Sequence, residues 1–308
     1  MDHLTNEDRF LLSEFKKLLR LNTQEEILNL DESFTHKFDF QIQRLEDVLR
    51  NTDRTIPPNR WSYHRIVFVK SGSGEFITGI YKHKAEKNTL VVIPARVTTS
   101  SKNWSMDAEA YVVLFNADFF LQNNFPSQSL ENKKILNAGI NPFIHLDESQ
   151  GDEMAAIFEK ILLEKTSGNI NKDELIALKV LELLILSERF FEEGRHFEGS
   201  QPPNEAIKKF IELLDEHYIR EHQVKFYADK LAIHPNYLNA LLKRHSGFSA
   251  KESIRNKILL ETKYLLHSTS LSVKEISNQL GFKDPNYFNV FFKQLEKVSP
   301  LNYRSDNL

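Results

Sequence analysis

The chain has 308 residues, of which 41% are hydrophobic and 27% charged, the proportions of an ordinary globular protein with room for two domains. It contains no cysteine, which excludes disulfides and thiolate metal sites, and no apolar run approaches the ~18 residues of a membrane span. The net charge of −3 is unevenly divided, since residues 205–308 hold 16 Lys and Arg against 12 Asp and Glu. A mildly basic C-terminal part suits nucleic acid. Without a secretion signal at the start of the sequence, a cytoplasmic location with no membrane contact is expected.

The first predicted element is an amphipathic helix over residues 6–21, which we expect to pack on the next domain or on a partner chain. The following part of the chain is rich in β-branched and aromatic residues in short runs separated by turn formers. Such closely spaced short strands predict a small barrel or sandwich. The runs cover residues 34–45, 65–69, 75–80, 89–93 and 110–115.

Two helical patterns follow, over residues 151–165 and 172–193, and together they predict a helical hairpin. Asn171 and Glu174 form a candidate capping box at the start of the longer helix. That helix is apolar around much of its circumference, which fits burial within the domain or self-association into a homodimer. A polar stretch with Gly and Pro then predicts a linker at 196–204 between an N-terminal domain, 1–195, and a C-terminal domain, 205–308.

One sequence unit is used twice in the C-terminal domain. Pro235–Asn239 recurs as Pro285–Asn289, and the pattern around each copy predicts a short helix, a tight turn and a second helix. That outline is typical of a helix-turn-helix DNA reader. A helix from about residue 249 to 267, on the order of 25 Å long, would join the copies and place the second helices, near 235–244 and 285–295, in successive major grooves.

Outward-facing residues of the two second helices are the candidate DNA contacts. Asparagine can bond adenine through both amide atoms, valine can contact a thymine methyl, and cations suit phosphates. The residues predicted to read bases are Asn236, Asn239, Ala240, Asn286, Asn289 and Val290. The residues predicted to bind phosphate are Lys243, Arg244 and Lys293.

The C-terminal domain resembles the double helix-turn-helix domain of the AraC/XylS family of transcriptional regulators. The resemblance rests on the string from Ser272 to Phe288, with Gly281 and Pro285, on Phe291-Phe292-Lys293, and on Ser299-Pro300 with Tyr303-Arg304. It implies an α+β protein, with a cupin-like β-barrel and helical hairpin followed by an all-α reader of seven helices. It also implies a regulator whose N-terminal domain binds a small-molecule effector or a second subunit, with double-stranded DNA and RNA polymerase as partners. Many family members have an arginine where this chain has Ala240 and Val290, so its sequence preference should differ.

Large aromatic residues on or near the predicted strands are the candidate lining of an effector pocket, although they equally fit a barrel core. They are Trp61, Tyr63, Tyr81, Trp104 and Tyr111. The resemblance places metal-binding histidines of cupins at positions where this chain has Asn59, Trp61 and Thr98. No metal, cofactor or catalytic residue is therefore expected. A cupin-type enzyme with an accessory helical domain is the alternative function. The sequence leaves the operator, the effector and the choice between activator and repressor open.

Overall fold

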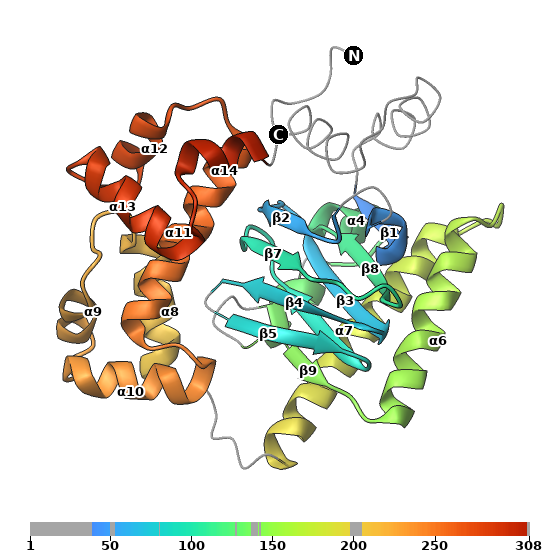
Figure 1. Cartoon of the computed structure of the whole chain (residues 1–308). Coiled ribbons are helices and arrows are strands. Elements are labelled where there is room, and N and C mark those ends of the chain that lie inside the picture. The colour runs from blue at the N-terminus through green and yellow to red at the C-terminus, as the bar shows by residue number, and fades with distance from the viewer. Residues whose placement is uncertain are drawn as a thin grey trace.

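The computed structural model describes residues 39–49, 53–79, 81–126, 128–136, 141, 143–197 and 205–306. The predicted helix at 6–21 lies outside these residues. Within them the chain forms a β-rich domain with a helical hairpin, followed by a purely helical domain (Figure 1). The predicted α+β class is confirmed.

The β-rich domain contains two antiparallel sheets whose strands are not joined by hydrogen bonds into one closed barrel. The five-stranded sheet has the order β1 (Phe40–Arg44), β8 (Glu109–Phe115), β3 (His64–Ser71), β6 (Thr89–Ile93) and β9 (Phe143–His145). The four-stranded sheet has the order β2 (Ile56–Asn59), β7 (Thr99–Lys102), β4 (Ser73–Thr78) and β5 (Tyr81–Glu86). Short helices α3 (Leu45–Leu49), α4 (Ala117–Gln122) and α5 (Gln128–Glu131) and the 3-10 turn η1 (Lys134–Leu136) lie between strands.

Strands of the five-stranded sheet were predictable because β3, β6 and β8 are buried on both faces and read as continuous apolar runs. Of the predicted run 34–45, residues 34–38 lie outside the described residues, Phe40–Arg44 form β1, and Leu45 begins α3. Four strands were missed for a physical reason. β2 contains two prolines, β5 alternates charged with buried residues, β7 is built from Ser and Thr, and β9 has three residues.

The hairpin of α6 (Glu148–Lys165) and α7 (Lys172–Phe197) covers the outer face of the five-stranded sheet. Phe68 stacks on Phe158 of α6 with ring centroids 5.9 Å apart. The capping box that starts α6 is formed by Asp147 and Gln150. The capping box predicted at Asn171 is wrong, because Asn171 has a left-handed φ of 58° and cannot adopt the extended backbone of an N-cap.

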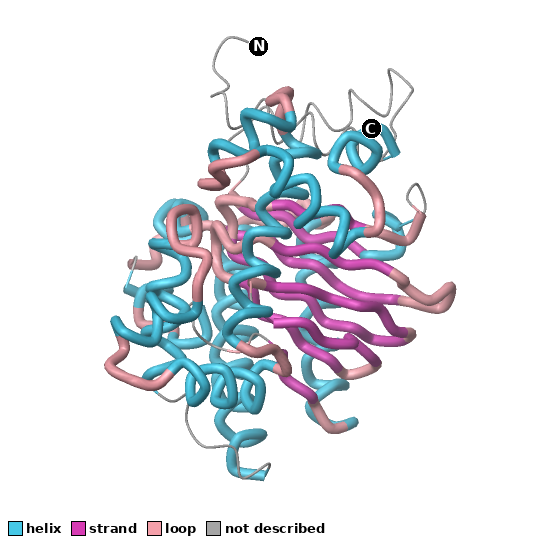
Figure 2. The backbone as a smooth tube through the Cα atoms, turned by 60° about the vertical axis from the view of Figure 1, so that its left-hand side comes forward, coloured by secondary structure: helices cyan, strands magenta, loops and turns pink. Residues whose placement is uncertain are grey.

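The helical domain contains seven helices in residues 205–306, as predicted. They are α8 (Glu205–His217), α9 (Val224–Lys230), α10 (Pro235–Ser246), α11 (Ala250–Ser268), α12 (Val273–Gln279), α13 (Pro285–Glu296) and α14 (Pro300–Asp306). Helix α11 lies between the two repeated units, with α10 at one end and α12 and α13 at the other (Figure 1). It also packs against β2, so that helices lie across the four-stranded sheet (Figure 2).

Candidate nucleic-acid interface

The first reading helix, α10, is set by residues at its two ends. The Nδ1 atom of His234 accepts a hydrogen bond from the Asn236 N–H, and Pro235 occupies the first helical position, where its missing donor costs nothing. At the other end Gly247 adopts a left-handed φ of 80° and its N–H caps the carbonyl of Lys243. Leu238 and Leu242 are fully buried, which fixes the opposite face toward solvent.

The second reading helix, α13, repeats this construction with a tighter turn before it. Asp284 caps the helix by accepting a 2.8 Å hydrogen bond from the Asn286 N–H. Gly281 has a φ of +75°, and a Cβ at this position would lie 1.8 Å from the carbonyl oxygen of Ile219. Glycine is therefore required by both backbone conformation and space. Phe288, Phe291 and Phe292 are buried, as predicted from the periodicity.

The outward faces of α10 and α13 carry the residues predicted to contact DNA. Eight of the nine predicted residues are exposed, namely Asn236, Ala240, Lys243, Arg244, Asn286, Asn289, Val290 and Lys293. Val290 is 51% exposed, an uncovered apolar side chain in the middle of the face.

Asn239 differs from the other eight, because its Oδ1 accepts a 3.2 Å hydrogen bond from the Lys251 N–H at the start of α11. Its equivalent, Asn289, forms no such side-chain bond to the described part of the chain. A bidentate contact to adenine needs both amide atoms, so Asn239 would first have to give up its bond to α11.

The spacing of the reading helices is set by α11, whose 19 residues correspond to about 28 Å at 1.5 Å per residue. Its capping box, Ser249 with Glu252, fixes where the helix begins next to α10. This length suits two helices that enter neighbouring major grooves on one side of a duplex, about 34 Å apart.

The structure does not bring the five predicted pocket aromatics together. Tyr111 faces α6 and donates a hydrogen bond to Glu159, whereas the others lie on the opposite side of the five-stranded sheet. Tyr63, Tyr81 and Trp104 are buried, with Trp104 edge-on to Phe76 of β4 and Tyr81 edge-on to His245 of α10. Of the five, Trp61 lines a cavity in the described part of the β-rich domain.

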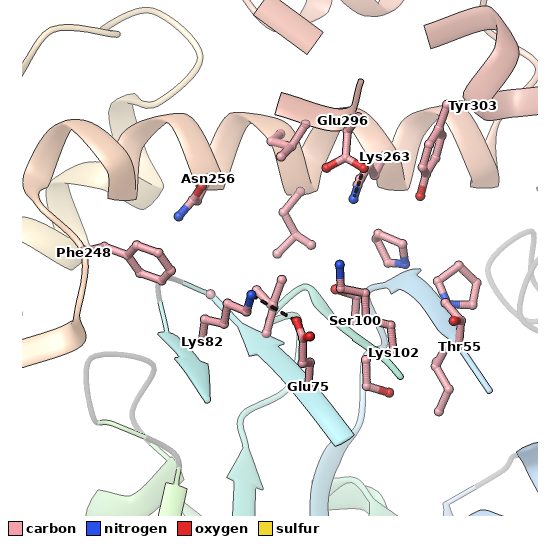
Figure 3. A pocket seen from close by; sticks show the side chains of 18 residues that line it. Thr55, Glu75, Lys82, Ser100, Lys102, Phe248, Asn256, Lys263, Glu296 and Tyr303 are labelled. Carbon is pink, nitrogen blue, oxygen red and sulfur yellow. Dashed lines mark ion pairs between the residues drawn. The ribbon is translucent and has the colours of Figure 1, made fainter. Parts of the chain in front are cut away.

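Two cavities lie in or beside the β-rich domain. The inner cavity, about 50 Å³, lies between the sheets and is lined by Asn59, Trp61, Arg65, Thr99 and Val112 among others. The domain cavity, about 280 Å³, lies between the four-stranded sheet and α11 (Figure 3).

The walls of the domain cavity carry charge from both domains. Lys82 and Glu75, at 3.0 Å, form an ion pair on the sheet, and Lys263 and Glu296, at 2.7 Å, form one on the helices (Figure 3). Burial lowers the pKa of Lys263, while the attraction of Glu296 opposes this change.

A buried carboxylate on α11 joins the two domains. Glu261 is 2% exposed and accepts hydrogen bonds from Arg60 and, at 3.0 Å, from the hydroxyl of Thr98. Lys257, one turn earlier, lies 3.7 Å from the same carboxylate. Sequence reasoning missed Glu261. The available signal was a charged residue three positions after Ile258 and four before Leu265, on the apolar face of the predicted helix, but its partners Arg60 and Thr98 belong to the other domain.

Histidines in the β-rich domain have structural surroundings. His64 accepts a 3.1 Å hydrogen bond from the Ala95 N–H, and burial lowers the pKa of His64 to about 4. His83 packs on Phe143 with ring centroids 4.3 Å apart. In the described parts of the chain, no three His, Asp or Glu side chains are grouped to hold a metal ion. None of the helices described there has the length and apolar character of a membrane span.

The chain matches a family model, several proteins of known sequence and several solved structures. A family model described as a helix-turn-helix domain matches residues 227–306. The transcriptional activator RhaS of Mannheimia succiniciproducens is 23% identical over 261 residues, covering 83% of this chain and 91% of that protein. The transcriptional regulator YijO of Escherichia coli is 34% identical over 105 residues, which cover 34% of this chain and 36% of that protein.

Among solved structures, ToxT from Vibrio cholerae is 15% identical, with a TM-score of 0.42 over 87% of this chain and 98% of that chain. The matched range of the family model, 227–306, contains both reading helices, α10 and α13. The chain is a DNA-binding transcriptional regulator similar to these proteins, and residues 227–306 form its helix-turn-helix domain.

Proposed function

We propose that the exposed faces of α10 and α13 read one DNA duplex, with Asn286, Asn289 and Val290 of α13 providing most of the base contacts. The observation that supports this is the repeated face itself, polar amides followed by Lys243 or Lys293 on two helices in units joined by α11, which is about 28 Å long. Asn236 and Ala240 contribute from α10. Lys243, Arg244 and Lys293 bind phosphate and fix the register.

Base readout by Asn289 predicts a loss that depends on DNA sequence. Asn289→Ala should weaken binding to the cognate site about 5- to 150-fold, as expected for the loss of one bidentate contact, and leave random DNA little affected. The cognate site would first be selected from a random pool with the unmodified protein. Asn302→Ala, an exposed asparagine of α14, is the matched control. Equal losses on both DNAs would contradict the readout role of Asn289.

Phosphate binding by Lys293 predicts a loss of affinity that does not depend on the DNA sequence. Lys293→Ala should weaken binding to cognate and random DNA alike, and the slope of log affinity against log salt should become shallower by about one unit. A slope identical to that of the unmodified protein would contradict a phosphate contact.

We also propose that the protein acts as a homodimer formed through α7. Leu175, Leu178 and Ile185 are 43%, 47% and 43% exposed and lie along one stripe of this helix, while its other side is buried on the sheet. An equivalent stripe on a second copy would cover it in a self-complementary way. Leu178→Glu should shift the mass in solution from dimer to monomer, and a dimer that survives this change would refute the interface.

We further propose that a small molecule controls DNA binding through the N-terminal domain. The inner cavity and the domain cavity support this, because either could hold such a molecule. RNA polymerase remains the candidate partner for a regulator bound beside a promoter. A change in cognate-DNA affinity on adding an effector tests this control, and DNA binding that no added molecule changes would argue against it.

A further inference from the structure

A buried guanidinium lies at the centre of the β-rich domain. Arg65, on β3, is 4% exposed, and its side chain enters the space between the two sheets. Nη1 donates 2.8 Å hydrogen bonds to Asn59 Oδ1 and Thr99 Oγ1, and Nη2 donates to the carbonyl of Val97 at 3.2 Å. Trp61 covers the guanidinium at 4.9 Å from its ring centre. The group is therefore held in one orientation.

This guanidinium lacks an anionic partner in the part of the chain that the structure describes. Its Nε–H is buried with no acceptor, and Nη2 uses one of its two N–H groups. The contacts that Arg65 does make are to neutral oxygens and an aromatic ring. Burial lowers its pKa to about 9, which shows how poorly the positive charge is compensated. Buried charges are normally paired, because an isolated one loses its hydration without replacement.

Arg65 is one of the residues that line the inner cavity. On a guanidinium, the Nε–H and one N–H of the adjacent Nη lie side by side, and this edge binds the two oxygens of a carboxylate. The rest of the lining is largely apolar, including Val67, Phe76 and Val112. With about 50 Å³ for water-sized atoms and 10–15 Å³ needed for each, the cavity holds roughly four such atoms.

We propose that the inner cavity binds a small carboxylate, whose two oxygens pair with the free edge of Arg65 and whose apolar part lies against Val67, Phe76 and Val112. A carboxylate fits better than an amide or alcohol because only an anion compensates the buried charge. This inference names the effector class of the small-molecule control proposed above and rests on that proposal.

The same site has a direct route to the DNA-binding domain. Asn59 and Thr99 hold Arg65 inside the sheets, and their chain neighbours Arg60 and Thr98 hold Glu261 of α11 outside. Arg60 Nε also donates to Thr98 Oγ1 at 2.8 Å, which ties the two neighbours together. The pairing of β2 with β7 is irregular between Ile56 and Asn59, next to these contacts. A bound carboxylate that shifts Asn59 or Thr99 therefore also shifts Arg60 and Thr98, the two residues that hold Glu261 of α11.

The first test uses the unmodified full-length protein and matched pairs of probes, acetate with acetamide and propionate with propionamide. At about ten times the dissociation constant, a carboxylate should raise Tm by roughly 3–6 °C, and the uncharged partner should not. Sodium chloride at equal ionic strength is the salt control. Equal shifts from amide and carboxylate, or none from either carboxylate at saturating concentration, would overturn the site.

The second test uses three variants, of which two separate carboxylate binding from its effect on DNA affinity and the third is a control. Arg65→Met should abolish the carboxylate shift, whereas Glu261→Gln should keep the shift and lose any effect of the carboxylate on DNA affinity. Arg60→Gln, which removes the neighbouring, partly exposed guanidinium, should also keep the shift. A carboxylate shift that persists in Arg65→Met would overturn the proposal. Binding of the cognate duplex without carboxylate is measured separately, so failure of the DNA-binding proposal would be seen independently.

Discussion

The contact between the two domains predicts a measurable loss of stability when Glu261 is removed. Its carboxylate accepts hydrogen bonds from Arg60 and Thr98 and lies 3.7 Å from Lys257, with only 2% of the residue exposed. Glu261→Ala would leave Arg60 and Lys257 without this partner. Breaking a buried pair in this way costs about 3–5 kcal/mol.

The cost of Glu261→Ala should lie below this range, because its partners keep other contacts. The Arg60 side chain is 30% exposed and can turn toward water, and Lys257 keeps Asp215 at 2.8 Å. We therefore expect Glu261→Ala to cost about 2–3 kcal/mol, and Glu261→Gln about half of this, because the amide can still accept from Thr98.

The assay is chemical denaturation of the full chain, followed by fluorescence of the two tryptophans, Trp61 and Trp104, which lie in the β-rich domain. Small-angle scattering of the same samples would report separation of the domains. Glu212→Ala, an exposed glutamate of α8, is the matched control and should change stability by less than about 0.5 kcal/mol. If Glu261→Ala changed the free energy of unfolding as little as this control and left the domains in contact, the bonds of Glu261 to Arg60 and Thr98 would not hold the domains together.

Three further changes have expected outcomes. Gly281→Ala should cost at least about 2 kcal/mol in denaturation, because the residue has a positive φ and its Cβ would meet Ile219; an unchanged midpoint would contradict the turn geometry. Lys297→Gly should stabilise by roughly 1 kcal/mol, since Lys297 holds a φ of 67° at the position where the first copy has Gly247. His64 should make stability fall by about 3 kcal/mol as the pH drops from 6.5 to 4, because the unfolded chain protonates near 6.5 and the folded one only near 4. The pH dependence should be flatter in His64→Asn by that amount, and an identical curve would show that His64 is not the cause.

The helical domain was largely predictable because its signals are local. Helix caps and a buried face recur within each copy, and the second copy adds a glycine turn at Gly281. Pro235 and Pro285 therefore identify the reading helices without knowledge of the rest of the fold. The β-rich domain was less predictable, since β2 and β5 are defined by their neighbours in the sheet rather than by their own composition. The role of Asn239 depends on the distant Lys251 N–H, and those of Arg65 and Glu261 on partners from other strands or the other domain.

The two repeated units use different ends of the reading helices for different contacts. The predicted base-reading residues lie in the first two turns of α10 and α13, whereas the contacts with the β-rich domain come from the last turns and from α11. His245, near the end of α10, packs against Tyr81 at 6.2 Å between ring centres, and Glu296, at the end of α13, lines the domain cavity. Because a helix moves as a rigid rod, a change at these last turns would alter the angle at which the first turns meet a groove. Control of DNA binding therefore does not require that the β-rich domain cover the reading faces, only that it hold α11 and both helix ends in one of two positions.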